Sequence, residues 1–261
     1  MSAADSSAAQ PNPMDPWSEL RSTTQSRIGL GRAGDALPTR RVLEFRVAHA
    51  AARDAVHLPL DVAAFTSAVG DVGLGKPSVV RSLAADRGQY LRRPDLGRAP
   101  ADLDAIRRAG ADVGFVLADG LSPRALMDHG APLLAAIVAE LPGHYTLAPP
   151  VVATQARVAL GDHIGAALGV TTLVMLIGER PGLSVADSVG IYLTHRPQPA
   201  RTDADRNCIS NVHPPDGLGY VQAARVVAGL VSGARRLGRS GVDLKDTSRA
   251  AAIGTAEALE L

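Results

Sequence analysis

The only cysteine of this 261-residue chain lies in the segment DADRNCISNVHPP, close to groups that could take part in chemistry. Cys208 stands two positions before Ser210 and five before His213. A cysteine nucleophile needs a base within hydrogen-bond reach and a neighbour that stabilises the thiolate, and Asp205, Arg206 and His213 are the local candidates. The same thiol could instead be a small, polarizable packing group. Spacing within one segment does not establish geometry, so both interpretations of Cys208 stay open.

A second candidate is Glu179 in the segment IGERPG. It follows the strongly apolar run TTLVMLIG, so its carboxylate is expected to emerge at the carboxyl end of a buried strand, and Gly182 permits a tight turn. Ligands of open α/β sheets bind beyond the carboxyl ends of the strands. Glu179 is therefore either an acceptor directed into a ligand crevice or part of a solvated turn with a local ion pair.

Other familiar motifs are incomplete. GLGRAG at 29–34 matches G-x-G-x-x-G, with Asp54 about twenty residues on, but the preceding RSTTQSR is polar and does not resemble a buried strand. A nucleotide-binding α/β protein is thus an alternative that lacks its expected context. No G-x-S-x-G elbow is present, which argues against an α/β-hydrolase. The seven histidines are scattered without metal-ligand spacing, so we expect no metal site.

The pattern of apolar residues predicts the elements that must position these groups. Short apolar runs alternate with helical patterns after about residue 100, and Ser122 with Pro123 is typical of a helix start. Ser184 and Asp187 fit a capping box for another helix. We predict an α/β fold with a Rossmann-like, doubly wound, mostly parallel sheet, preceded by a small helical N-terminal region. LADGLS, IGERPG and the stretch after LTHRPQP should lie at its carboxyl edge. The expected strands are DVGFVLA, the extended region around PPVVAT, TTLVMLIG and VGIYLTH, and the expected helices include GDHIGAALG and 220–237.

Composition divides the chain into three parts. Residues 1–15 are rich in Ser, Ala and Pro and predict a disordered tail. Residues 16–95 carry helical patterns such as TRRVLEFRVAHAAARDAV, and Gly-Pro clusters interrupt them before the α/β part at 96–261 begins.

The overall composition excludes several classes of function. The formal charge of +1 and the 3% of aromatic residues argue against a nucleic-acid partner, and no apolar run is long enough for a membrane span. One cysteine cannot form an internal disulfide, and the first residues lack the pattern of a signal peptide. We expect a cytoplasmic protein.

Five segments together resemble a known family. LRSTTQSRIGLGRAG, YLRRPDLGR, LADGLS, IGERPGLSVADSVGIYLTHRP and DADRNCISNVHPP resemble, in this order, segments of the small (light) subunit of ethanolamine ammonia-lyase. The resemblance runs from about residue 15 to about residue 237.

This resemblance implies an adenosylcobalamin-dependent enzyme that converts ethanolamine to acetaldehyde and ammonia by a radical route. It places the substrate pocket and the acid-base residues in a barrel-shaped large subunit, so this chain would hold no catalytic residue and would be inactive alone. The active form would be a multimer of large and small subunit pairs. The small subunit contributes part of the cobalamin site, which makes 96–261 the cobalamin-binding domain. Matching the family segments implies cofactor contacts from Val158, Glu179 and Cys208.

Two further expectations accompany the resemblance. Another cobalamin class inserts the histidine of D-x-H-x-x-G beneath cobalt, whereas in GDHIGAALG His163 directly follows Asp162. The absence of that motif agrees with the base-on cofactor that the resemblance implies. Some relatives carry an amphipathic N-terminal helix for packaging into a bacterial microcompartment, but MSAADSSAAQPNPMDP has no such periodicity, which favours the plain cytoplasm.

Overall fold

The structure is a computed structural model that describes residues 15–247. The expected tail at 1–15 therefore lies outside the described residues, apart from Asp15. The chain divides into two compact units, of which one ends at Ala51 and the other begins at Ala52. This division differs from the expected boundary near residue 95. The difference arises because β1 (Ser78–Arg81) already belongs to the sheet, where it pairs with β3 (Val151–Thr154).

The first unit holds α1 (Ser18–Ser22) and most of α2 (Thr39–His57), which confirms the helical pattern of TRRVLEFRVAHAAARDAV. Of the residues of α2, Ala55 alone is buried, and its Leu43 and Val47 are exposed. None of the helices formed by residues 15–247 combines the length and apolarity needed to cross a membrane.

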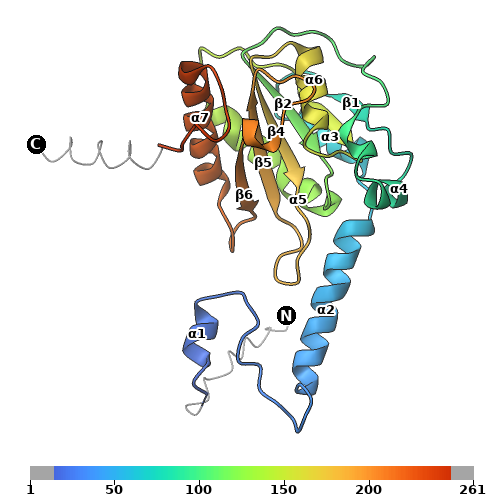
Figure 1. The fold of residues 1–261 in the computed structure, drawn as a ribbon, viewed down its shortest axis with the longest axis vertical. Coiled ribbons are helices and arrows are strands. Elements are labelled where there is room, and N and C mark those ends of the chain that lie inside the picture. The colour runs from blue at the N-terminus through green and yellow to red at the C-terminus, as the bar shows by residue number, and fades with distance from the viewer. Residues whose placement is uncertain (1–14, 248–261) are drawn as a thin grey trace, which may run out of the picture. The chain divides into compact units, whose positions relative to one another are not determined.

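Six strands of the second unit form one mixed sheet, in the order β1-β3-β2-β4-β5-β6 (Figure 1). The first four of these run parallel, β5 is antiparallel to β4, and β6 is antiparallel to β5. This confirms an α/β fold with a mostly parallel sheet. The four expected strands are present, whereas β1 and β6 were not expected. The remaining strands are β2 (Val113–Ala118), β4 (Thr172–Gly178), β5 (Val189–His195) and β6 (Arg206–Val212).

Helices cover both faces of this sheet. Successive side chains of a strand point to opposite faces, so the apolar residues on each face pack against a layer of helices. On one face Phe115 and Leu176 pack with α3 (Val62–Gly70), α5 (Pro123–Glu140) and α7 (Tyr220–Leu237). On the other face Val116 and Met175 pack with α6 (Leu160–Leu168). Strands β2 and β4 are buried along their whole length, which explains why their sequences are continuous apolar runs.

The predicted start of α5 is confirmed. Ser122 is its N-cap, with Oγ accepting a hydrogen bond from the Ala125 amide at 3.2 Å, and Pro123 occupies the first turn. The capping box expected at Ser184 and Asp187 is wrong, because residues 181–188 form an irregular connection into β5 and no helix. The helix α4 (Arg87–Arg92) and two short 3-10 helices, Leu96–Arg98 and Asp203–Asp205, complete the elements of the second unit.

His195 is buried at the edge of the sheet where β5 ends and β4 begins. Its Nδ1 lies 2.9 Å from Thr172 Oγ1, and its amide donates to Ser240 Oγ at 2.8 Å. Burial lowers the pKa of His195, and the nearby Arg196 lowers it further. The ring is therefore neutral in the folded protein over a range in which an unfolded chain would protonate it.

This lowered pKa predicts a loss of stability in mild acid. The unfolded chain binds a proton near about pH 6.5 that the folded chain binds only at lower pH, so the free energy of unfolding falls as the pH decreases through that window. Urea titrations at about pH 7.5 and about pH 5.5 on wild type and His195→Gln measure this contribution. The variant should show a smaller pH dependence than wild type, and His57→Gln, at an exposed position, should not. Equal pH dependence in wild type and His195→Gln would contradict this role of His195.

Candidate functional site

The loops after β2 and β4 meet at the carboxyl edge of the sheet, as predicted for LADGLS and IGERPG. The Leu121 amide donates to the Gly178 carbonyl at 2.9 Å. Gly120 has φ +54°, and a Cβ there would lie 2.2 Å from that same carbonyl oxygen, so only glycine permits this approach. Two of the three segments expected at this edge are therefore brought together.

The third expectation, for the stretch after LTHRPQP, is wrong. Because β5 runs antiparallel to β4, its last residue His195 lies opposite Thr172, the first residue of β4. The following chain therefore starts at the amino edge, and β6 has to run back along β5. Cys208 is consequently in the middle of β6, opposite Tyr192, and not at a strand end.

Asp119 organises the carboxyl ends of β2 and β3. This buried carboxylate accepts hydrogen bonds from the amides of Gln155 at 2.8 Å and Ala156 at 3.1 Å, and it lies 3.6 Å from Arg87 Nη1. Burial raises the pKa of Asp119, while the two amides and the guanidinium act in the opposite direction. These contacts fix the turn that directly precedes Arg157.

A pocket of about 420 Å³ opens at this edge and brings together two of the three predicted residues. Val158, from the turn just before α6, and Glu179, the residue after β4, both line it. The pocket is of the size that holds part of a small-molecule ligand. Its other lining residues are Tyr90, Gly120, Leu121, Arg157, Ile177, Gly178, Arg180 and Tyr192.

The carboxylate of Glu179 is held in place within the protein. Its Oε2 accepts hydrogen bonds from Ser188 Oγ at 2.7 Å and from the Asn211 amide at 3.1 Å. Its Oε1 lies over Gly190, where an added Cβ would approach to 2.9 Å. Glu179 thus connects the end of β4 to β5 and β6, and it presents a fixed acceptor at the wall of the pocket.

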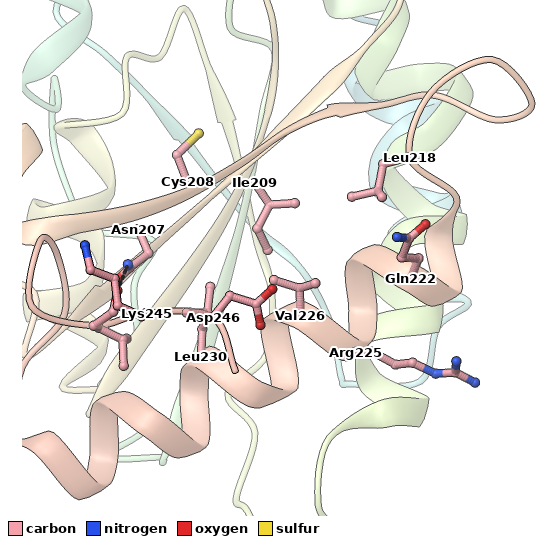
Figure 2. A pocket seen from close by; sticks show the side chains of 11 residues that line it. Asn207, Cys208, Ile209, Leu218, Gln222, Arg225, Val226, Leu230, Lys245 and Asp246 are labelled. Atoms are coloured by element: carbon pink, nitrogen blue, oxygen red, sulfur yellow. Dashed lines mark hydrogen bonds between the residues drawn. The ribbon is translucent and has the colours of Figure 1, made fainter. Parts of the chain in front are cut away.

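Cys208 is exposed and does not line that pocket, but it adjoins the same face through Tyr192. Its Sγ lies 3.3 Å from Ser210 Oγ. Burial raises the pKa of the Tyr192 phenol, and its contact with Cys208 raises it further. Figure 2 shows the Cys208 side chain on the opposite side of β6 from that of Ile209, and both residues contribute to the lining of a separate pocket of about 470 Å³ beside α7. The Cys208 side chain therefore shares a face of the sheet with Val158.

A buried ion pair connects the helix that follows Val158 to the strand that carries Cys208. Asp162 in the first turn of α6 and Arg206 at the start of β6 form it, and both side chains are only 2% exposed. Arg206 also donates to Asp203 Oδ1 at 2.8 Å and to the Arg201 carbonyl at 3.0 Å. The segment carrying Val158 and the strand carrying Cys208 are thereby held in one arrangement.

Sequence reasoning missed the residues that join these groups. Tyr192 and Arg157 each line both the 420 Å³ pocket and a neighbouring pocket of about 370 Å³. Tyr192 is a large aromatic residue between the core residues Ile191 and Leu193, which is the one signal that its side chain faces the other side of β5.

A match to a family model bears on the identity of the chain. Residues 14–245 match the model of the ethanolamine ammonia-lyase light chain. This chain belongs to that family. The match covers nearly all described residues of both compact units, and Val158, Glu179 and Cys208 all fall within it.

Curated relatives match this chain over almost their whole lengths. An ethanolamine ammonia-lyase small subunit from Rhodococcus erythropolis is 71% identical over 248 residues, which is 95% of this chain and 96% of the relative. Small subunits from Ralstonia nicotianae and Azotobacter vinelandii are each 47% identical, over 90% and 92% of this chain and 89% and 91% of their own lengths.

Proposed function

We propose that this chain is the cofactor-binding small subunit of an adenosylcobalamin-dependent ethanolamine ammonia-lyase. The observation that supports this proposal best is that Tyr192 lines one pocket with Val158 and pairs with Cys208 across the sheet, while two hydrogen bonds fix Glu179 at the wall of the same pocket. Val158, Glu179 and Cys208 are the proposed cofactor contacts. Catalysis, the conversion of ethanolamine to acetaldehyde and ammonia by a radical route, belongs to the assembled complex, and this chain contributes no catalytic residue.

The chemistry of these residues fits a corrinoid. A corrin has apolar faces and peripheral amides that can donate hydrogen bonds, and the site offers the apolar Val158 and Ile177 beside the carboxylate of Glu179. When bound, adenosylcobalamin would supply the homolysis of its cobalt–carbon bond. The protein residues would hold the ring, orient it and exclude water. Because the pocket on this chain is small and open, the rest of the enclosure is assigned to the large subunit.

The proposal includes the state of the cofactor and of the complex. We take the cofactor as base-on, the complex as a multimer of large and small subunit pairs, and the compartment as the cytoplasm. The lone thiol Cys208 suits a reducing compartment. The fold we assign to the Rossmann-like doubly wound class, because α5 and α6 connect successive strands on opposite faces of the sheet. An experimental structure of the complex with cobalamin tests these assignments together.

Reconstitution tests the division of labour. The purified chain mixed with large subunit and adenosylcobalamin should release ammonia from ethanolamine, whereas neither chain alone should do so. Deamination by this chain alone would overturn the proposal.

The alternative of a cysteine-dependent hydrolase is disfavoured by the surroundings of Cys208. Its sulfur contacts Ser210 and Tyr192, while Nε2 of His213 lies 2.9 Å from Asn211 Oδ1. A hydrolase would lose all activity in Cys208→Ser, whereas the proposed complex should keep turnover at saturating cofactor. The nucleotide-binding alternative also lacks support, because the GLGRAG segment lies in the first unit and not between a strand and a helix of the sheet.

A further inference from the structure

Arg157 stands between two pockets of the site and has a buried polar atom without a partner. It lines the 420 Å³ pocket together with Glu179, and it also lines the neighbouring 370 Å³ pocket. Within residues 15–247 the buried Nε of Arg157 has no hydrogen-bond partner. A buried polar group without a partner lowers the stability of the folded protein. A ligand that accepts a hydrogen bond from this guanidinium would offset that loss.

The position of Arg157 is fixed from two sides. Its guanidinium lies 4.8 Å from the ring centroid of Tyr90, which is fully buried, and its amide donates to the Gly97 carbonyl at 2.8 Å. A Cβ on Gly97 would come within 2.9 Å of Arg157 Cγ. The side chain is thus placed by packing before any ligand arrives, which reduces the entropy lost on binding.

The charges around Arg157 leave an excess of positive charge in the 370 Å³ pocket. Its ionisable lining residues are Asp95, Arg98, Arg157 and Asp203, apart from the phenol of Tyr192. Asp95 is paired with Arg93 at 2.7 Å, and Asp203 is paired with Arg206 at 2.8 Å. Among the described residues, neither Arg98 nor Arg157 has a carboxylate within 4.0 Å. Since Arg206 is also paired with Asp162, the three acids Asp95, Asp162 and Asp203 are set against Arg93, Arg98, Arg157 and Arg206, which leaves one net positive charge at the pocket.

Arg87 also lies beside Tyr90, but its guanidinium is engaged with other protein groups. Arg87 stacks on the other side of the site against Tyr90 at 4.9 Å, but it lies 3.6 Å from Asp119 and donates to the Gly120 carbonyl at 2.7 Å. It is occupied in holding the turn that precedes Arg157. In the 370 Å³ pocket the cations available to a ligand are Arg157 and Arg98.

We infer that Arg157, assisted by Arg98, binds the phosphodiester anion of the corrinoid's nucleotide loop. The inference rests on the proposed function, and it adds an anion-binding subsite to the three expected contacts. Guanidinium groups match the geometry of phosphate oxygens and retain their charge at all working pH values. Because Arg157 directly precedes Val158, an anion in the 370 Å³ pocket would orient the rest of the cofactor towards Val158 and Glu179.

The test compares three corrinoids with different portions of the nucleotide loop. Cyanocobalamin carries the phosphodiester and base, cobinamide phosphate carries the phosphate without the base, and dicyanocobinamide has neither. Their affinities for the complex of this chain with the large subunit are measured by visible absorbance titration, for wild type, Arg157→Gln and Arg157→Lys. Arg124→Gln is the matched control, since Arg124 is an exposed arginine on α5 paired with Asp128.

Arg157→Gln should lower the affinity for both phosphate-bearing corrinoids by about tenfold or more and leave that for dicyanocobinamide unchanged. Arg157→Lys should recover part of the loss, Arg98→Gln should show a smaller one, and Arg124→Gln none. An equal loss for all three corrinoids, or no loss for any, would overturn the anion subsite while leaving the proposed function intact. If the wild-type complex binds none of the three, the proposed function itself fails.

Discussion

Replacing Asp162 by alanine should lower the free energy of unfolding by about 3–5 kcal/mol, because the change leaves the Arg206 guanidinium buried without its main partner. Both side chains of this pair are 2% exposed, so water cannot take the place of the lost carboxylate. Asp203 remains beside Arg206 but is itself 92% exposed, and a solvated carboxylate compensates little. Urea denaturation of the purified chain measures the loss.

Two comparison variants separate the burial of charge from a simple loss of contact. Asp203→Ala removes the exposed partner of the same arginine and should cost less than about 1 kcal/mol. The double variant Asp162→Leu with Arg206→Met removes both charges and should recover most of the stability, because an apolar pair avoids the desolvation of two ions. Burial already raises the pKa of Asp162 in spite of the adjacent guanidinium, which agrees with a strong desolvation penalty. A double variant as unstable as Asp162→Ala would argue against this explanation.

The ion pair also links stability to the site. Asp162 lies four residues after Val158, and Arg206 lies two residues before Cys208. Loosening it should therefore separate the two segments that form the face of the site. Asp162→Ala should weaken cofactor binding to the complex even under conditions in which the chain stays folded.

The sequence predicts correctly those elements whose local pattern of residues fits only one type of secondary structure. Strands β2 and β4 are buried on both faces and are read as apolar runs, and Ser122 with Pro123 marks the start of α5 unambiguously. Glu179 is placed correctly because it follows such a strand. In these places a short stretch of chain determines its own structure.

Other features depend on partners far along the chain. Strand β6 is the last strand of the sheet and is only partly buried, and its polar sequence RNCISNV does not distinguish a strand from a loop. The sequence VGIYLTH does not show that β5 runs antiparallel to β4, so the position of Cys208 within β6 could not be predicted. The pairing of Asp162 with Arg206 joins residues 44 positions apart, and only the packing of α6 against the assembled sheet brings them together. Tertiary packing decided each of these cases.

Glu179→Ala should weaken cobalamin binding by the complex by about 1–3 kcal/mol, which corresponds to roughly 5- to 150-fold in the dissociation constant. The carboxylate is the acceptor fixed at the pocket wall, and its removal would leave a corrin amide donor without a partner. Glu179→Gln keeps the shape and one acceptor oxygen, so its loss should be smaller. Visible absorbance titration of the assembled complex measures each dissociation constant.

Two further variants distinguish the contact from its support. Ser188→Ala keeps the carboxylate of Glu179 but removes the hydroxyl that holds Oε2 at 2.7 Å, so its affinity should lie between those of wild type and Glu179→Ala. Glu140→Ala removes a carboxylate of the same type from α5, where it lies 3.7 Å from Arg225 and away from the site, and should bind as wild type does. Since Glu179 also holds the Asn211 amide, thermal unfolding of each variant establishes that the complex is folded during titration. Wild-type affinity in a folded Glu179→Ala complex would refute the contact, and Val158 with Cys208 would then have to hold the cofactor without this acceptor.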